Sequence, residues 1–245
     1  CSSLAEDCNN YSTGMLKSAD GTTQSAQTFG VLSQYVSETY SALGNTYPTL
    51  RENCGNAKPV FGSEFLSRLN LTGITVPFTS EANVNTDIPD FSIPFTMAHE
   101  LSHVKGYMQE DEANFLAYLV CSKSGYTELN YSAAIMGFIY AGNALNKVDS
   151  SSYINIYNTL NNTVTSDLQY NYNYWLKYRG AAADISSSVN SAYLQANGQT
   201  DGIESYGKMV DIMLDYYIQN NYSAKYSAPQ NDYSNQGGEI DEIIE

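Results

Sequence analysis

The residues best suited to do chemistry are His99 and His103, and they are the only two histidines in the chain. They frame the segment HELSH, which is an HExxH motif. On a helix, residues four apart lie on one face, one turn apart, so both imidazoles can reach a single metal ion. The motif favours zinc, with Glu100 beside the metal, where it can take a proton from water. Because both histidines of the chain fall in the motif, chance is a poor explanation for it.

A catalytic zinc ion needs a third protein ligand. Because the chain has no further histidine, we expect a carboxylate from the acidic segment at 109–114, QEDEAN, unless Cys121 serves instead. Glu110 is the preferred ligand and Glu112 is the alternative, although acids in the first turn of a helix can also be simply solvated. Asn114, one turn after Glu110, is placed to accept or orient a hydrogen bond from a ligand histidine.

Two helices must position these side chains. The apolar run IPFTMA before the motif fits a buried active-site helix over 94–105, with Ser92 or Thr96 as its cap, and Gly106 ends this helix. The acids begin the next helix, over 110–122. Apolar periodicity and turn residues predict further helices over 24–43, 59–69, 131–146, 165–178, 185–197 and 202–220.

One short β element interrupts the helices. Alternating β-branched residues over 73–79 predict a strand, which Pro77 would confine to a sheet edge. Such an edge can be purely structural, or it can pair with the extended backbone of a substrate. We interpret 81–94 as a loop. The predicted fold class is therefore mainly α (α+β), with an active-site helix and a small edge-strand β element.

The composition excludes two classes of function. Acidic residues number 26 and basic residues 11, which gives a net charge of −15 that nucleic acid and anionic membrane surfaces would repel. No stretch approaches the roughly 18 uninterrupted apolar residues of a membrane span. A surface rich in Ser, Asn, Thr and Tyr, with few Lys and Arg, fits an exported or cell-surface protein.

Four cysteines bear on the compartment. Cys1 and Cys8, with Cys54, are candidate disulfide partners in an oxidising environment, whereas Cys121 in the apolar run LAYLVC is predicted to be a buried free thiol. Because the chain begins at Cys1, we expect that a signal peptide, a lipoprotein signal or a set of membrane helices has been removed upstream. Residues 1–22 are expected to be loosely held, and 222–245 to be a mobile acidic extension.

The segment HELSH followed by EDEANFLAYL resembles the gluzincins, in which a downstream Glu completes HExxH. The runs PFTSEANVNTDIP, PFTMAHELSHVKGYMQEDEANFLAYLVC and YLQANGQTDGIESYGKMVDIML more closely resemble the bacterial membrane proteins of domain of unknown function 3810, over roughly 57–220. This resemblance implies a zincin-like zinc peptidase domain outside the cytoplasm that follows membrane helices. By motif position, His99 and His103 match the metal histidines, Glu100 the general base and Glu110 the gluzincin glutamate.

Two positions depart from the gluzincin pattern. Asn114 stands where many gluzincins have Asp, and the gap from His103 to Glu110 is very short. A peptidase also needs a donor that stabilises the oxyanion, and with both histidines in use the candidates are Arg179, Tyr193 and Tyr206.

The sequence therefore predicts an extracytoplasmic zinc metallopeptidase that acts on a peptide or protein, has no nucleic-acid partner and belongs to a membrane-anchored parent protein. A helical segment at 1–56 would pack on a zincin-like catalytic domain at 57–220, with a flexible acidic tail at 221–245. Two alternatives stay open. One is a non-catalytic zinc-containing sensor or binding domain, and the other is a self-processing or membrane-assembly factor whose acidic tail docks a partner.

Overall fold

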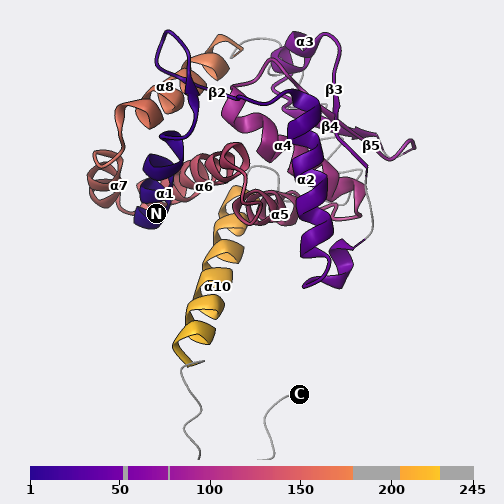
Figure 1. Cartoon of the computed structure of the whole chain (residues 1–245). Helices are drawn as coiled ribbons and strands as arrows, with labels where there is room; N and C mark the ends of the chain where they lie inside the picture. The colour runs from indigo at the N-terminus through magenta and orange to yellow at the C-terminus, as the bar shows by residue number, and fades with distance from the viewer. Residues whose placement is uncertain (52–54, 77, 179–204, 227–245) are drawn as a thin grey trace, which may run out of the picture.

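The fold is mainly helical with a small β component, which confirms the predicted class (Figure 1). A computed structural model describes residues 1–51, 55–76, 78–178 and 205–226. Its helices are α1 (Ser2–Ser12), α2 (Phe29–Leu43), α3 (Ser63–Arg68), α4 (Ile93–Val104), α5 (Glu110–Ser122), α6 (Thr127–Val148), α7 (Ser150–Tyr157), α8 (Asn162–Lys177) and α10 (Ser205–Tyr226). Two short 3-10 helices, η1 (Pro48–Leu50) and η2 (Asp90–Ser92), complete the helical part.

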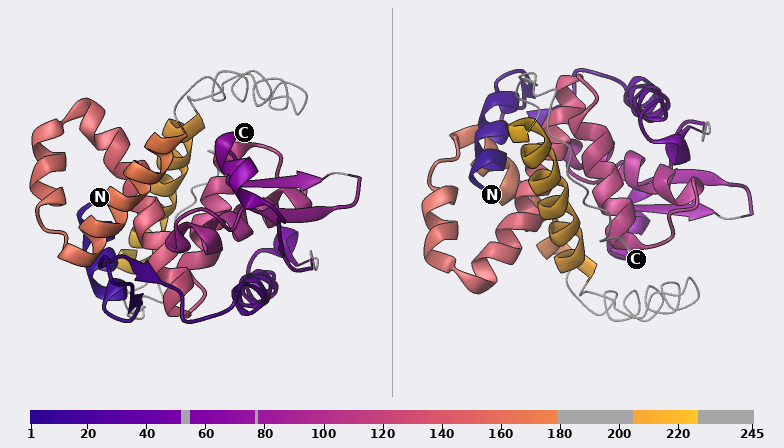
Figure 2. Two further views of the ribbon diagram at one scale, coloured as in Figure 1. Left: turned by 90° about the horizontal axis from the view of Figure 1, so that it is seen from above. Right: turned by 90° about the horizontal axis from the view of Figure 1, so that it is seen from below.

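Helices α4, α5 and α6 form the centre of the molecule and pack on one another. The sheet lies at one side of this centre and α7 with α8 at the other (Figure 2). Buried apolar residues form one core, which runs from Leu4 to Met213 and so joins residues on both sides of the predicted boundary at 56. Within the described residues, no helix is long and apolar enough to cross a membrane.

A three-stranded sheet has the order β3 (Lys58–Pro59), β5 (Glu81–Val84), β4 (Gly73–Val76). Strand β5 pairs parallel with β3 and antiparallel with β4, so β4 is an edge strand, as the sequence predicted. The prediction of a loop over 81–94 was wrong at its start. Residues of β5 are neither strongly β-branched nor aromatic, and they become a strand because two neighbours supply hydrogen-bonding partners.

The N-terminal region is ordered, contrary to the expectation for residues 1–22. Leu4, Ala5 and Cys8 are buried on α1, which packs on α6. A short hairpin of β1 (Leu16–Lys17) and β2 (Thr23–Gln24) follows. The buried carboxylate of Asp167 on α8 accepts hydrogen bonds from the Thr23 backbone N–H and hydroxyl, both at 2.8 Å, and from the Tyr131 hydroxyl. These contacts bind residues 1–24 to the core.

Other boundaries also differ from the prediction. The helix predicted from residue 59 starts at Ser63, because Lys58 and Pro59 pair with β5 and Gly62 takes a left-handed backbone conformation. Helix α2 begins at Phe29 rather than 24, α6 is longer than predicted, and α7 was not predicted. The helix predicted over 185–197 lies outside the described residues. The predicted mobile tail over 221–245 was wrong at its start, because α10 continues to Tyr226, and the remainder from 227 onward lies outside the described residues.

Among the described cysteines, Cys1, Cys8 and Cys121 are free thiols. Cys121 is buried, as predicted. Cys1 and Cys8 are therefore not bonded to each other, and Cys54 lies outside the described residues.

The start of α4 is stabilised by a residue from another helix. Ser92 precedes the helix, but its hydroxyl donates to the Pro89 carbonyl, and the Thr96 hydroxyl donates to the Ser92 carbonyl, so neither caps α4 as predicted. Instead, the N–H of Phe95, one of the first four that lack an intrahelical acceptor, donates to the hydroxyl of Ser132 on α6 at 3.0 Å.

Replacing Ser132 by Ala is expected to lower the free energy of unfolding by about 1–3 kcal/mol, because the Phe95 N–H would stay buried without an acceptor. Urea denaturation measures this difference. The matched control is Ser151→Ala, at an exposed position in the first turn of α7, where about 0.5 kcal/mol or less is expected. Equal effects of the two substitutions would show that the Ser132 hydroxyl does not stabilise α4.

Candidate metal centre

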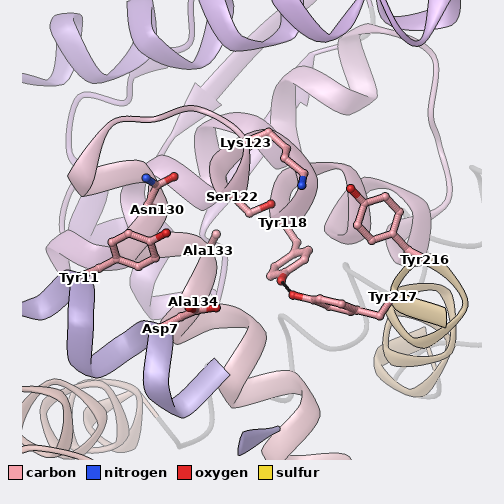
Figure 3. A pocket seen from close by; sticks show the side chains of 10 residues that line it. All are labelled: Asp7, Tyr11, Tyr118, Ser122, Lys123, Asn130, Ala133, Ala134, Tyr216 and Tyr217. Carbon is pink, nitrogen blue, oxygen red and sulfur yellow. Dashed lines mark hydrogen bonds between the residues drawn. The ribbon is translucent and has the colours of Figure 1, made fainter. Parts of the chain in front are cut away.

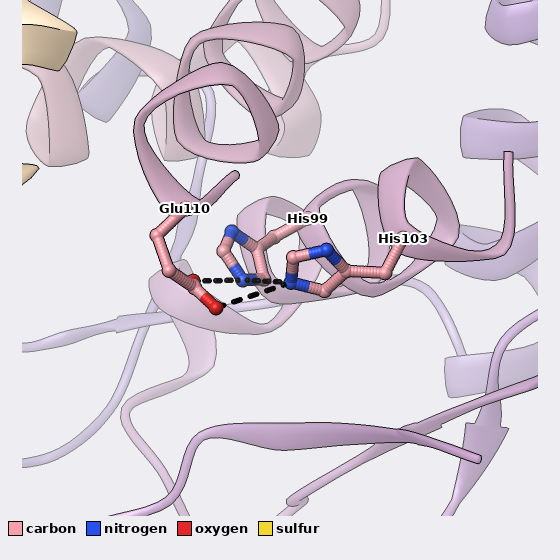
Figure 4. A group of neighbouring side chains, drawn as sticks. All are labelled: His99, His103 and Glu110. Atoms are coloured by element: carbon pink, nitrogen blue, oxygen red, sulfur yellow. Dashed lines mark hydrogen bonds and ion pairs between the residues drawn. The ribbon is translucent and has the colours of Figure 1, made fainter. Parts of the chain in front are cut away.

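His99 and His103 lie one turn apart on α4 and turn their rings toward the same point (Figure 4). The ring centroids are 4.7 Å apart and the ring planes are nearly perpendicular, at 86°. The two Nε2 atoms are 3.1 Å apart. The i, i+4 spacing therefore brings the two imidazole nitrogens together as the motif predicted.

The turn after α4 fixes the second histidine. Gly106 has φ of +94°, and the N–H groups of Gly106 and Tyr107 donate to the carbonyls of His103 and Ser102, which is a Schellman ending. This turn brings the Tyr107 carbonyl oxygen to 2.8 Å from Nδ1 of His103. Because a carbonyl only accepts hydrogen bonds, Nδ1 of His103 is the donor and its Nε2 keeps a lone pair for a metal.

The same turn directs Glu110, the first residue of α5, back onto the histidines. Its Oε2 lies 3.1 Å from Nε2 of His99, and its Oε1 lies 3.5 Å from Nε2 of His103. Glu112 is exposed and does not join this group. Residues two apart on a helix point about 200° from each other, so only one of the two acids can face α4.

The charges around Glu110 favour its ionised form. Burial by itself would raise the pKa of this carboxyl, but hydrogen bonds from His103 and His99 in their protonated forms, and the charge of those protonated rings, outweigh burial. The pKa of Glu110 is therefore held well below its usual range. An ionised carboxylate is the form that ligates metals.

The geometry of these three side chains fits a tetrahedral zinc ion. Zn–N distances of about 2.0–2.1 Å and tetrahedral angles place two ligand atoms about 3.3 Å apart. In the structure the two Nε2 atoms are 3.1 Å apart, Oε2 of Glu110 lies 3.1 Å from Nε2 of His99, and Oε1 of Glu110 lies 3.5 Å from Nε2 of His103. Two imidazole nitrogens that face each other this closely beside a carboxylate form a donor set that a cation would satisfy.

Asn114 lies one turn after Glu110 and is buried against the centre. Its side chain helps to raise the pKa of His99, against the effect of burial and together with the larger effect of Glu110. The hydroxyl of Tyr140 donates to Oδ1 of Asn114 at 3.3 Å. Nδ1 of His99 is buried and has no hydrogen-bond partner in the described structure. Asn114 therefore does not orient the His99 ring through a hydrogen bond to Nδ1.

Glu100 points from α4 toward the edge strand β4 rather than toward Glu110. Only 4% of it is exposed, and burial raises the pKa of its carboxyl, with a partial offset from the two histidines and Thr75. The hydroxyl of Thr75 lies 2.7 Å from Oε2 of Glu100 and 3.0 Å from its backbone carbonyl. Thr75 was not among the predicted site residues, because no local sequence pattern shows which face of a predicted strand covers a helix.

A comparison with protein families identifies the chain. The family model described as Protein of unknown function (DUF3810) matches residues 1–214. The chain belongs to this family. Searches of curated proteins and of solved structures found no match. The DUF3810 match begins at residue 1 rather than near 57, so it includes α1 and α2 as well as the candidate metal centre.

The predicted oxyanion donors of this DUF3810 chain are not among the described side chains. Arg179 and Tyr193 lie outside the described residues, and of Tyr206 the structure describes only the backbone, in α10. Their role stays a prediction.

A hollow of the DUF3810 chain lies between α1, α5, α6 and α10 (Figure 3). The hydroxyls of Tyr118 and Tyr217 are hydrogen-bonded to each other, and Lys123 Nζ lies 5.8 Å from the ring centre of Tyr216. These contacts fasten α10 to α5. None of the metal-centre residues lines this hollow, and its contacts explain the packing of α10 rather than chemistry.

Proposed function

We propose that this chain is a zinc-dependent peptidase with a zincin-like domain of the gluzincin type. His99, His103 and Glu110 would hold the zinc ion, and Glu100 would act as the general base. One observation supports the proposal: the Nε2 atoms of His99 and His103 lie 3.1 Å apart, and one oxygen of the Glu110 carboxylate lies 3.1 Å from the first while the other lies 3.5 Å from the second, distances close to those between the ligands of a tetrahedral zinc ion.

The number of ligands favours catalysis over a purely structural zinc site. Structural zinc sites are usually closed by four protein ligands, whereas catalytic sites have three and keep a position for water or substrate. Over the described residues, no fourth His, Cys, Asp or Glu joins the group. The side chains of His99 and Glu110 are 13% and 22% exposed, so solvent reaches the centre. These features weigh against a non-catalytic sensor or binding domain.

Zinc, when bound, would polarise a substrate carbonyl and lower the pKa of a water molecule. The chain's own residues supply the remaining steps. Glu100 accepts a proton from the attacking water, and it then delivers that proton to the amine that leaves. His103, held through Nδ1 by the Tyr107 carbonyl, keeps its Nε2 lone pair directed at the metal position.

The edge strand supports a peptide as the substrate. One side of β4 pairs with β5, and its other side is a sheet edge. An extended peptide can add to such an edge through main-chain hydrogen bonds. Because Thr75 of β4 contacts Glu100, a peptide on this edge would run beside the proposed general base. We further propose that the domain lies outside the cytoplasm in a membrane-anchored parent, which its polar, acidic composition supports.

Metal analysis combined with a proteome-derived peptide library tests the function. We expect about one zinc ion per chain and cleavage of some peptides, detected by mass spectrometry. A chelator should abolish cleavage and added zinc should restore it, whereas His99→Ala should show neither zinc nor cleavage. Cleavage that persists in metal-free protein would contradict the proposal.

A further inference from the structure

The carboxylate of Glu100 is held from the sheet side by two residues of β4. Gly73 and Thr75 are two apart on this strand and therefore face the same side, toward α4, while Ile74 between them is exposed. The register with β5 pairs Gly73 with Val84 and Thr75 with Ala82, and both partners are buried. The inner face of the edge strand thus rests directly on Glu100.

Thr75 fixes one carboxylate oxygen. Its hydroxyl has a single proton and lies closer to Oε2 of Glu100, at 2.7 Å, than to the backbone carbonyl of that residue, at 3.0 Å. Thr75 and Glu100 are both buried, where a hydrogen bond to a carboxylate is stronger than in water. This bond restricts rotation of the carboxylate and leaves Oε1 as the other oxygen.

Gly73 provides the space for that other oxygen. A Cβ atom at residue 73 would lie 2.6 Å from Oε1 of Glu100, 2.7 Å from its Cγ and 2.8 Å from its Cδ. All three distances are below any ordinary carbon contact. Gly73 does not have a positive φ, so its backbone conformation does not require glycine. Glycine is required here because any larger side chain would clash with the Glu100 carboxylate.

We propose that Thr75 and Gly73 are positioning residues for Glu100, Thr75 by holding Oε2 and Gly73 by leaving room for Oε1. The catalytic part of this inference rests on the proposed function. Strand β4 would then act in two ways. The backbone at its outer edge would pair with the substrate, and the residues on its inner face would orient the general base.

The first test is enzymatic and uses zinc-loaded protein with a peptide found in the library. Thr75→Val, which removes the hydroxyl and keeps the shape, should lower kcat about 100-fold with little change in KM, because the substrate-binding backbone is unaltered. Thr75→Ser should recover kcat to within about fivefold. Gly73→Ala should lower kcat at least as much as Thr75→Val. Zinc content should stay the same in all three variants.

The control is Thr46→Val, which makes the same chemical change at an exposed position between α2 and η1, away from the sheet. It should leave kcat and KM unchanged. The inference is overturned if Thr75→Val keeps full kcat, or if Thr75→Ser loses as much kcat as Thr75→Val.

The second test needs no substrate. In urea unfolding at fixed free zinc, Thr75→Val and Gly73→Ala should each raise the unfolding equilibrium constant about tenfold in the wild-type background. In a Glu100→Ala background Gly73→Ala should have little effect, because the atoms that clash with a Cβ are gone, and Thr75→Val should have a smaller effect than in the wild-type background, because only the bond to the backbone carbonyl of residue 100 remains to be lost. Equal effects in the two backgrounds would overturn the inference. If the wild-type chain binds zinc but cleaves no peptide, the proposed function fails, while this cycle still decides whether β4 holds Glu100.

Discussion

Glu100→Gln is expected to lower peptide cleavage by about 10²–10⁴-fold while zinc stays bound, because an amide cannot accept the proton of the attacking water. The substitution keeps the size of the side chain, and its amide oxygen can still accept the hydrogen bond from Thr75. The three proposed ligands are unchanged. Cleavage rates at saturating peptide and zinc per chain, measured on the same preparation, separate loss of the base from loss of the metal.

The matched control for this substitution is Glu112→Gln. Glu112 is exposed on the first turn of α5, next to the centre in sequence but not part of it. Its variant should cleave at the wild-type rate and retain zinc. Full activity of Glu100→Gln would contradict the general-base mechanism. Loss of zinc from the Glu100→Gln variant would mean that Glu100 supports the metal ligands rather than the reaction.

Glu110→Ala is expected to weaken zinc binding by more than the 10–100-fold that loss of an outer partner costs, on the order of 10²-fold or more. Among the described His, Cys, Asp and Glu side chains, removal of this carboxylate leaves the nitrogens of His99 and His103 as the ligand atoms of the group. The loss should also appear as reduced stabilisation. Zinc at 100 times its dissociation constant stabilises a folded protein by about 2.7 kcal/mol, so thermal unfolding of the variant should respond much less to added zinc.

Zinc content after dialysis and the shift of Tm with zinc provide the two measurements. Glu112→Ala serves as the control, since it removes an equivalent carboxylate that faces solvent. Full zinc retention in Glu110→Ala would contradict its role as ligand. Loss of zinc in Glu112→Ala instead would transfer that role to Glu112.

Local patterns predicted those parts of the fold in which local interactions decide the structure. The helix around HELSH and the helix at Glu110–Ser122 were predicted to within one residue at each end, because apolar periodicity and Gly106 define them within a few residues. The predictions failed where contacts with residues far along the chain determine the local structure. Helix α1 packs on α6, more than a hundred residues later, and β5 exists because β3 and β4 flank it.

The sequence by itself determined the pairing of His99 with His103, since four residues make about one helical turn wherever the helix lies. It also required the third ligand to come from another residue type, because the chain holds no third histidine. Only the tertiary structure decided that Glu110 rather than Glu112 faces the histidines, through the turn at Gly106 and the packing of α5 on α4. It alone brought Thr75 and Gly73 onto Glu100, because the register of an edge strand and the face it buries depend on partners far along the chain.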